Sequence, residues 1–380
     1  MAIGDIVGVI QTLTDDEQGL RPHIAYRGGN IGVLVIRGPD NHGWVKSFSV
    51  SDAGELSADY IGALEFDGVT CDRPRVIHIS GDVFAVVYEG VDHDGWLKTF
   101  SVNAAGAIAG IDLVGLEFDD AAAYDPKICH VSGNTFAIAY TDNANDPRVK
   151  TVSISGAGAI AGIDLVGLVI GAASGAQPDI CHVSGEIFAV AYNGDLQEHT
   201  IATFTISGDG TIGGAVIDTT VFDTEYGTQF SLATNGTGMV AIAYLFDWDN
   251  SGKLTTVTID GEGNISAVKD TFALDADACI EPEIITFRDG FYAIVYQGVA
   301  GDGFLKTIGI DAGGNIDAAP IGTLEFETVD SSYPSIAHIA GDTYAIGSCD
   351  ASGATPFGKI HTVGIITSLI WGRAHMMGML

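Results

Sequence analysis

The sequence is poor in positive charge, and this shortage excludes whole classes of partner. Only 16 of the 380 residues are Lys or Arg, against 49 Asp and Glu, so the net charge is −33. Such a surface repels the phosphates of nucleic acids and the head groups of anionic membranes. We therefore expect no nucleic-acid partner, and a surface suited to salty or extracellular surroundings.

Long apolar runs and cysteine motifs are also missing. No stretch approaches the ~18 apolar residues that a membrane helix needs, and the start, MAIGDIV, shows no signal peptide. Five cysteines, without CxxC spacing, predict neither a zinc ribbon nor a disulfide framework. We expect no membrane span, no disulfides, and a location outside the cell or on the surface of a particle.

What the sequence does contain is a strict repeat of 52 residues. The apolar segment VFAVVY returns as TFAIAY, IFAVAY, MVAIAY and FYAIVY, and its tyrosines keep that spacing at Tyr88, Tyr140, Tyr192, Tyr244 and Tyr296. Prolines at 22, 74, 126, 178, 282 and 334 have the same period, with Phe230 in the remaining slot. The chain therefore holds seven copies of one unit.

Six of the copies contain four short segments rich in Val, Ile, Phe and Tyr, separated by tight turns such as SGN and NAAG. Segments of this kind predict four antiparallel strands joined by hairpins. The second segment is apolar throughout, as expected for a strand covered on both faces. A four-stranded unit of this length, repeated seven times, predicts an all-β fold, a seven-bladed β-propeller.

The N-terminus explains how the ring closes. Residues 2–10 read AIGDIVGVI and align with the fourth strand AGIDLVGLE at 109–117, whereas the last copy supplies only three strands. We predict that the N-terminal strand, residues 2–13, completes blade seven, that the propeller spans 1–366, and that 367–380 form an apolar tail.

This tail, rich in methionine, is a candidate docking segment. We predict that it adds a strand to a second copy of the chain or to a larger particle. The residues that would make this contact are Leu369, Ile370, Trp371, Met376, Met377 and Met379. The alternatives are that it folds back on its own blade or is disordered.

The docking hypothesis has a direct test. Light scattering should show that the full chain assembles, whereas a chain ending at residue 366 is a monomer. If both are monomers, the tail is not an assembly segment.

The phrases HISGDVFAVVYEG and HDGWLKTFSV resemble a repeat of uncharacterised bacterial, archaeal and phage-like surface proteins expected to be propellers. The resemblance covers roughly residues 1–366. It implies the fold and carries no activity, ligand or catalytic residue.

Aromatic residues precede the third strand in four contiguous blades. They are Trp44, Trp96, Phe304 and Phe357, in blades one, two, six and seven. An aromatic arc of this kind suits stacking on sugar rings or a protein contact. The alternative is that each ring covers the edge of its own blade.

The same turns hold closely spaced acids, Asp92 with Asp94, and Asp247, Asp249 and Ser251 in DWDNSG. Alternating oxygen ligands before a glycine resemble the start of a calcium loop, although the distal carboxylate is missing. Ordinary turn chemistry is the alternative. We expect no required cofactor, with calcium as the one metal to test.

Two further polar sets recur with the repeat. His78, His130, His182 and His338 share one slot of the first strand, where a metal-binding ring competes with hydrogen bonding to the neighbouring blade, the favoured interpretation. Lys46, Lys98, Lys150 and Lys306 share a slot of the third strand, where we expect solvated cross-strand pairs.

These observations favour a non-enzymatic surface or structural protein, a rigid propeller for display or adhesion that assembles or anchors through its tail. The alternative is a glycan-binding, lectin-like module that uses the aromatic arc, with or without calcium. A third hypothesis is a polysaccharide-active enzyme with its site in the central channel. It requires singular polar residues facing inward, and we expect the near-identical blades to offer few; no catalytic residue is predicted.

Overall fold

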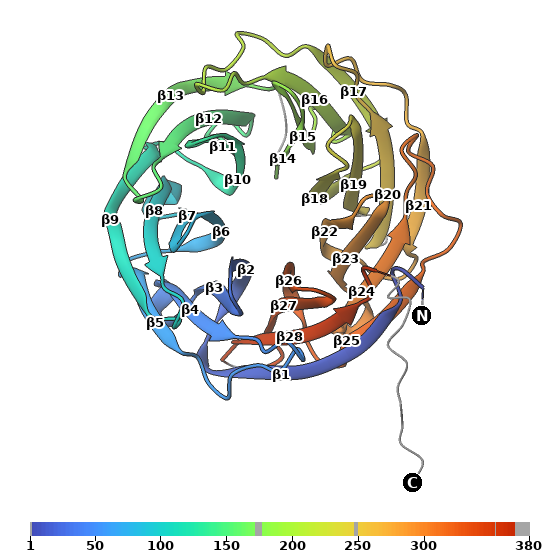
Figure 1. Cartoon of the computed structure of the whole chain (residues 1–380). Helices are drawn as coiled ribbons and strands as arrows, with labels where there is room; N and C mark the ends of the chain where they lie inside the picture. The colour runs from blue at the N-terminus through green and yellow to red at the C-terminus, as the bar shows by residue number, and fades with distance from the viewer. Residues whose placement is uncertain (1, 172–176, 247–249, 354, 369–380) are drawn as a thin grey trace.

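The computed structural model describes residues 2–171, 177–246, 250–353 and 355–368, which form seven four-stranded antiparallel sheets. The sheets stand as blades around a central channel, each with its first strand innermost (Figure 1). The all-β, seven-bladed propeller predicted from the repeat is confirmed. In the described ranges, no helix is long and apolar enough to cross a membrane.

Blades one to three follow the chain in order from the inner to the outer strand. Blade one contains β2 (Leu20–Gly28), β3 (Ile31–Arg37), β4 (Gly43–Ser49) and β5 (Gly62–Asp67). Blade two contains β6 (Asp72–Ser80), β7 (Val83–Glu89), β8 (Gly95–Val102) and β9 (Ile108–Asp119). Blade three contains β10 (Tyr124–Ser132), β11 (Thr135–Thr141), β12 (Pro147–Ile154) and β13 (Ile160–Val169).

Blades four to six repeat the same order. Blade four contains β14 (Asp179–Ser184), β15 (Ile187–Asn193), β16 (His199–Thr205) and β17 (Asp218–Asp223). Blade five contains β18 (Gly227–Thr234), β19 (Met239–Phe246), β20 (Ser251–Thr258) and β21 (Asp270–Asp275). Blade six contains β22 (Ile280–Arg288), β23 (Phe291–Gln297), β24 (Gly303–Gly309) and β25 (Gly322–Glu327). Short 3-10 helices join the second and third strands of blades one, two and six, namely η1 (Pro39–Asn41), η2 (Val91–His93) and η3 (Val299–Gly301).

Blade seven joins the two ends of the chain. Its inner strands are β26 (Ser332–Ala340), β27 (Thr343–Asp350) and β28 (Phe357–Ile365), and the N-terminal β1 (Ile6–Gln18) pairs with β28 as the outer strand. Two backbone bonds extend this pairing, from Gly4 N–H to the Ile366 carbonyl at 2.8 Å and from Ile366 N–H to the Asp5 carbonyl at 3.0 Å. The closing strand is therefore the predicted one, although it begins and ends later than residues 2–13. The division at residue 366 stays a prediction.

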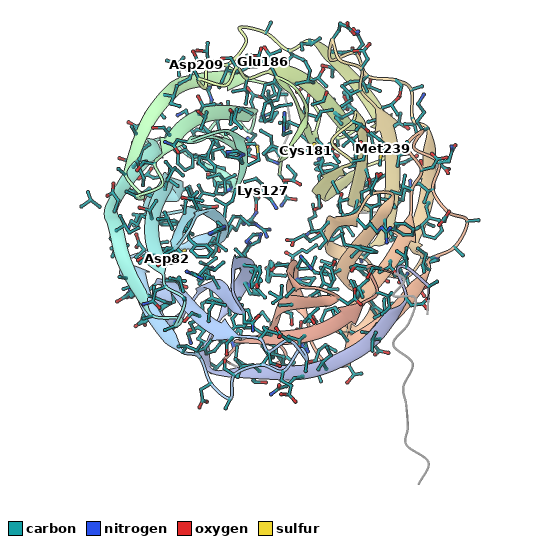
Figure 2. All side chains as sticks on the ribbon, viewed as in Figure 1. Asp82, Lys127, Cys181, Glu186, Asp209 and Met239 are labelled. Atoms are coloured by element: carbon teal, nitrogen blue, oxygen red, sulfur yellow. The ribbon has the colours of Figure 1, made fainter. Side chains whose placement is uncertain are left out.

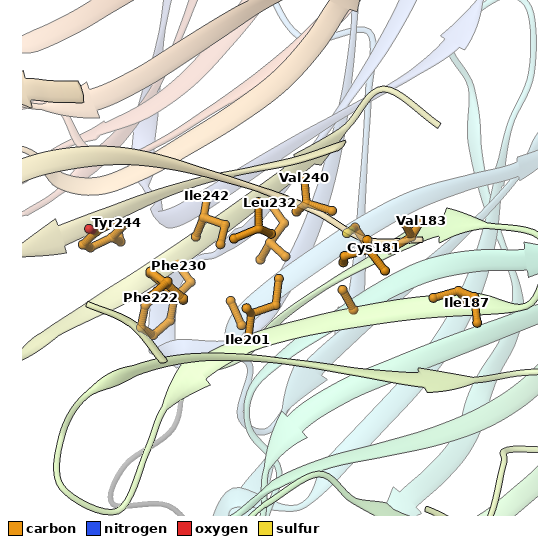
Figure 3. Packing of buried hydrophobic residues seen from close by; sticks show 14 residues of the cluster. Cys181, Val183, Ile187, Ile201, Phe222, Phe230, Leu232, Val240, Ile242 and Tyr244 are labelled. Carbon is orange, nitrogen blue, oxygen red and sulfur yellow. The ribbon is translucent and has the colours of Figure 1, made fainter. Parts of the chain in front are cut away.

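The core lies between the blades. Every residue of β7, β11 and β15 is buried, because each second strand is covered by the blades on both sides. The packed apolar side chains form seven clusters, each shared by two neighbouring blades, and Figure 3 shows the one between blades four and five. Four of the five cysteines are buried in this core, Cys129 is half-buried, and all five are free thiols.

A hydroxyl group joins each blade to the next. A Ser or Thr of the third strand donates to the carbonyl of a left-handed glycine in the turn before the next blade's outer strand, at 2.5–2.7 Å. The seven pairs are Ser47–Gly106, Thr99–Gly158, Thr151–Gly210, Thr203–Gly263, Thr256–Gly314, Thr307–Gly4 and Thr362–Gly54. The Thr307–Gly4 bond holds the segment that leads into β1, and the Thr362–Gly54 bond joins blade seven to blade one, so the closure uses the same bond as the other interfaces.

The recurring lysines are little exposed rather than solvated, which corrects the expectation: Lys98, Lys150 and Lys306 form ion pairs with the preceding blade, and Lys46 lies over the Tyr60 ring. Lys150 Nζ lies 2.8 Å from Asp119 Oδ2, at the end of the preceding blade, and donates to the Phe118 carbonyl at 2.6 Å. Tyr140 donates its hydroxyl to the same carboxylate at 2.6 Å. The Lys150 contacts and the Tyr140 hydrogen bond lower the pKa of Asp119 against the opposing effect of burial. Lys98 and Asp67 repeat the arrangement one blade earlier.

The recurring histidines bond within their own blade, which also corrects the expectation. Each Nε2 lies 2.8–3.0 Å from the carbonyl of the glycine three residues later, in the turn between first and second strands. Each ring also packs against the aromatic side chain that begins the second strand, Phe84 in the case of His78. Recurrence here reflects turn formation.

We predict that Asp119→Ala destabilises the fold by about 3 kcal/mol, because it leaves the Lys150 ammonium buried without a counter-charge. Adding Lys150→Ala should restore part of this loss. The double variant reproduces the interface between blades three and four, where Gly171 and Ala202 occupy these two positions. Urea unfolding of the wild type, both single variants and the double variant gives the coupling; additive losses would show that the pair contributes nothing.

Candidate binding site in the central channel

Two rings of side chains line the channel where the inner strands begin. The mouth ring precedes the periodic proline, and its backbone is left-handed in all seven blades, with φ between 37° and 59°. It consists of Arg21, Arg73, Asp125, Gln177, Gln229, Glu281 and Tyr333. The floor ring follows the proline and consists of His23, Arg75, Lys127, Asp179, Ser231, Glu283 and Ser335.

The left-handed backbone at the mouth ring is a costly choice for residues with side chains. Glycine adopts this conformation without steric cost, whereas other residues pay roughly 1–2 kcal/mol. It places a β-bulge at the start of the strand, as between Asp72 and Arg75 on β6, and bulges redirect side chains. The chain uses no glycine at any of the seven positions, so the side chains themselves are needed there.

The mouth ring, four of the floor residues (Arg75, Lys127, Ser231 and Glu283) and several of the residues between them line a cavity of about 250 Å³, to which every blade contributes. The mouth ring lies at the N-terminal ends of the inner strands, and therefore on the face that carries the connections between blades. The turns between second and third strands share this face, since Ala123 N–H donates to the carbonyl of His93 in η2 at 2.8 Å. The cavity thus belongs to the face with the most variable turns.

The floor ring acts as a belt between neighbouring blades. In five blades its side chain accepts a backbone N–H from the next blade at 2.7–3.2 Å. The pairs are Asp179–Leu232, Ser231–Ile284, Glu283–Ile336, Ser335–Ile24 and His23–Val76. The two remaining positions hold Arg75 and Lys127, whose side chains have no acceptor atom. The belt is therefore interrupted at blades two and three.

The mouth ring continues the belt on the opposite side of the channel. Gln177 accepts the N–H of Gln229 at 3.2 Å, Gln229 accepts that of Glu281 at 2.7 Å, and Glu281 accepts that of Tyr333 at 2.8 Å. The guanidinium carbon of Arg21 lies 4.7 Å from the centre of the Tyr333 ring. A row of amide and carboxylate acceptors thus ends at an aromatic ring.

Most of the charges in the channel are paired. Arg21 Nε lies 2.9 Å from Asp72 Oδ1, and Arg73 pairs with Asp125. Arg75 reaches across the channel to within 3.5 Å of Glu283 Oε2. Lys127 lies on the channel wall (Figure 2), and its ammonium group makes no hydrogen bond or ion pair within the described ranges.

Burial shifts the titration of these groups. It raises the pKa of Glu281 to about 7, although Arg21 and Arg75 act in the opposite direction. Burial also raises the pKa of Glu283 and lowers the pKa of His23 well below its ordinary value. The pKa of Lys127 is lowered by burial first and by the nearby Arg75 charge second. The channel therefore holds several groups with unusual protonation equilibria.

The predicted aromatic arc lies away from this cavity. Trp44, Trp96 and Phe304 are half-buried at the start of their third strands and pack against three different interblade clusters. Each ring covers a glycine of the preceding turn, where a Cβ atom would lie 2.4–2.5 Å from the ring. The three rings do not converge on one pocket, and their binding role stays a prediction.

Phe357 does not occupy the same slot as the other three. It pairs with Asp350, whereas Trp96 and Phe304 pair with the periodic tyrosines, and the corresponding position of blade seven is Lys359. The arc therefore contains three equivalent aromatics, and the sequence alignment in blade seven is shifted by two residues.

The candidate calcium ligands are only partly described. Asp92 is exposed in η2, and Asp94, together with burial, raises the pKa of the neighbouring Glu117. Ser251 begins β20, while Asp247 and Asp249 lie outside the described residues. In the described part of the chain, no three His, Cys, Asp or Glu side chains are grouped to hold a metal ion. Calcium binding therefore stays a prediction.

Tail docking also stays a prediction. The residues expected to make this contact lie outside the described ranges, namely Leu369, Ile370, Trp371, Met376, Met377 and Met379.

The channel site was missed by the sequence analysis, and the expectation that the blades offer few singular polar residues is wrong. The positions before and after each periodic proline differ from blade to blade, with Arg, Lys, His, Asp, Glu, Gln, Ser and Tyr among them. Variation at a fixed distance from a strictly repeated residue was the available signal.

No family model and no curated protein sequence matches this chain. Its structure is similar to that of the BP39L lectin from Burkholderia pseudomallei, with a TM-score of 0.60 and 13% identity over 93% of this chain and 97% of the lectin. The polysaccharide lyase Uly1 is similar with a TM-score of 0.58 and 9% identity, over 95% of this chain and 100% of the lyase. A variant of Aleuria aurantia lectin in complex with α-methyl-L-fucoside has a TM-score of 0.50 and 8% identity, over 82% of this chain and 98% of the lectin. At these identities the likeness shows the fold alone.

We predict that Glu281→Gln flattens the pH dependence of stability between about pH 4.5 and pH 7. Over this window the folded wild type keeps a proton that the unfolded chain releases, so its stability falls as the pH rises, by up to about 3 kcal/mol. Glutamine does not titrate, and Gln177 and Gln229 show that it fits the slot.

Urea unfolding of both proteins at several pH values measures the difference. The carboxylates paired with the interblade lysines have lowered pKa values and act below this window, in both proteins alike. Parallel stability curves for wild type and variant would contradict the raised pKa.

Proposed function

We propose that the protein is a lectin-like, carbohydrate-binding module and that its sugar site is the channel cavity. One observation carries the proposal: a cavity of about 250 Å³ around which no two blades present the same pair of residues on the two sides of the periodic position. A purely structural channel has no need for such variation, because all seven blades make the same bends. Small-molecule pockets have this form, a concave site with a few convergent polar groups.

The chemistry of the mouth ring suits sugar hydroxyls. Gln229 and Glu281 each keep acceptor capacity beyond the backbone bond that they accept, since an amide or carboxylate oxygen has two lone pairs. Arg21 and Arg73 supply planar arrays of donors on the other side of the mouth. Tyr333 adds an aromatic ring for the apolar face of a pyranose.

The structural neighbours are consistent with the proposal without carrying it. BP39L and Aleuria aurantia lectin are lectins by name, and the latter is bound to a fucoside. The architecture therefore supports sugar sites in other chains. A role in display or adhesion stays a prediction, and so does a location outside the cell. A sugar-binding module is compatible with both.

We predict that Tyr333→Gln weakens sugar binding roughly tenfold, because it removes the aromatic surface and places in blade seven the residue found in blades four and five. Trp96→Thr should leave the affinity unchanged. Threonine fills that slot in blade four as Thr200, which makes this variant a control for the fold as well as for the aromatic arc.

The sugar is found first with a glycan array, and affinities are then measured by calorimetry, with thermal unfolding as the check on folding. If Trp96→Thr abolishes binding and Tyr333→Gln does not, the sugar binds at the aromatic arc and the channel proposal is wrong. If no glycan binds the wild type, carbohydrate binding itself is wrong.

A further inference from the structure

Cations are concentrated in the channel of an otherwise acidic protein. Arg21, Arg73, Arg75 and Lys127 all line the cavity, and they are four of the 16 Lys and Arg residues in a chain of net charge −33. All four belong to blades one, two and three. Positive charge is thus gathered on one side of the channel, although it is scarce in the rest of the chain.

Two of these cations occupy positions where the fold itself calls for an acceptor. The floor-ring slot bonds the next blade through serine in blades five and seven and through acids in blades four and six. Arg75 and Lys127 have no acceptor and give up that bond. A residue that departs from the local structural rule without improving stability marks a functional position.

The charge of Lys127 is also left without a close partner. Its ammonium has no ion pair within the described ranges, and burial together with Arg75 lowers its pKa against the opposing effect of the Asp179, Glu283 and Asp125 charges. Arg75 is only loosely engaged, at 3.5 Å from Glu283, which exceeds the 2.7–2.9 Å of a strong charge-assisted bond. An anion bound at these two neighbouring floor positions would offset both costs.

The other side of the cavity differs in character. Blades four, five and six present Gln177, Gln229 and Glu281 at the mouth, all of which accept hydrogen bonds. A ligand that fits both sides has an anionic group at one end and hydroxyl groups at the other. Sugars that carry a carboxylate or a sulfate have this combination.

We infer that the channel binds an acidic sugar, with its anionic group at Lys127 and Arg75 and its hydroxyls toward Gln229 and Glu281. This inference rests on the proposed carbohydrate binding and narrows it to a chemical class. Lys127 is the anchoring residue for the charge, whereas the mouth ring would serve neutral and acidic sugars alike.

The test compares sugars that differ only in charge. The probes are uronate oligosaccharides with their methyl esters, and sulfated oligosaccharides with their desulfated forms, measured by calorimetry. The acidic member of at least one pair should bind roughly ten- to a hundredfold more tightly than its neutral form. Which pair does so distinguishes carboxylate from sulfate.

The variant that isolates the anchor is Lys127→Ser. The same slot holds serine in blades five and seven, as Ser231 and Ser335. A serine at position 127 should therefore restore the bond to the Ile180 N–H and keep or raise the melting temperature. It should also remove the preference for the acidic probe, which Lys127→Arg should retain. The matched charge control is Lys269→Ser, at an exposed position outside the cavity. This substitution should change neither the melting temperature nor the preference for the acidic probe.

A second measurement needs no variant. Acetylation of the wild type with an N-hydroxysuccinimide ester, followed by peptide mass spectrometry, should modify Lys127 less when the acidic probe is bound. Lys269 serves as the internal reference.

Equal binding of charged and neutral members, or a charge preference that survives Lys127→Ser, would overturn the inference while leaving carbohydrate binding intact. An absence of binding to any probe, charged or neutral, overturns both. Unprotected Lys127 in the presence of saturating acidic probe also overturns the inference.

Discussion

The hydroxyl-to-carbonyl bond between each blade and the next is the interaction on which the ring depends. It occurs at all seven interfaces with nearly the same length, including the two on either side of blade seven, where the ring closes. Its acceptor must be the carbonyl of a left-handed residue in a tight turn, which explains the glycine in each of those turns. Because one bond geometry is repeated seven times, each blade meets the next in the same way, and seven equivalent interfaces frame the channel.

A fixed channel lets a few unrepeated side chains define a site. The residues that repeat, such as the histidines at the first turns and the Tyr–Asp–Lys contacts between blades, are accounted for by bonds within the fold. The residues flanking the periodic proline are held by the same backbone and yet differ, and Arg75 and Lys127 do not supply the interblade bond that the other floor residues make. Rigid strands place them more accurately than loops would, which is what a binding site requires.

The period and the apolar pattern of the second strand were sufficient to predict the fold, because each blade must bury both faces of that strand. The closing strand followed from the likeness of residues 2–10 to a fourth strand. The burial of Lys150 could not be predicted, since its partner Asp119 belongs to the preceding blade and lies 31 residues earlier in the sequence. The variation beside each proline could be seen in the sequence, but nothing there indicates the bulge that turns these residues toward the axis.

An acidic exterior and an anionic ligand are compatible because the two charges act at different ranges. At physiological ionic strength, salt screens exposed charges beyond about 8 Å, so most of the 49 carboxylates have little effect on a group inside the channel. Partly buried charges at short distance are screened much less, and Lys127 and Arg75 are of this kind. The nearest opposition comes from Asp179, Glu283 and Asp125, the carboxylates whose charges act on Lys127. The local field at the floor of the channel is therefore set by its own few residues and not by the net charge of the protein.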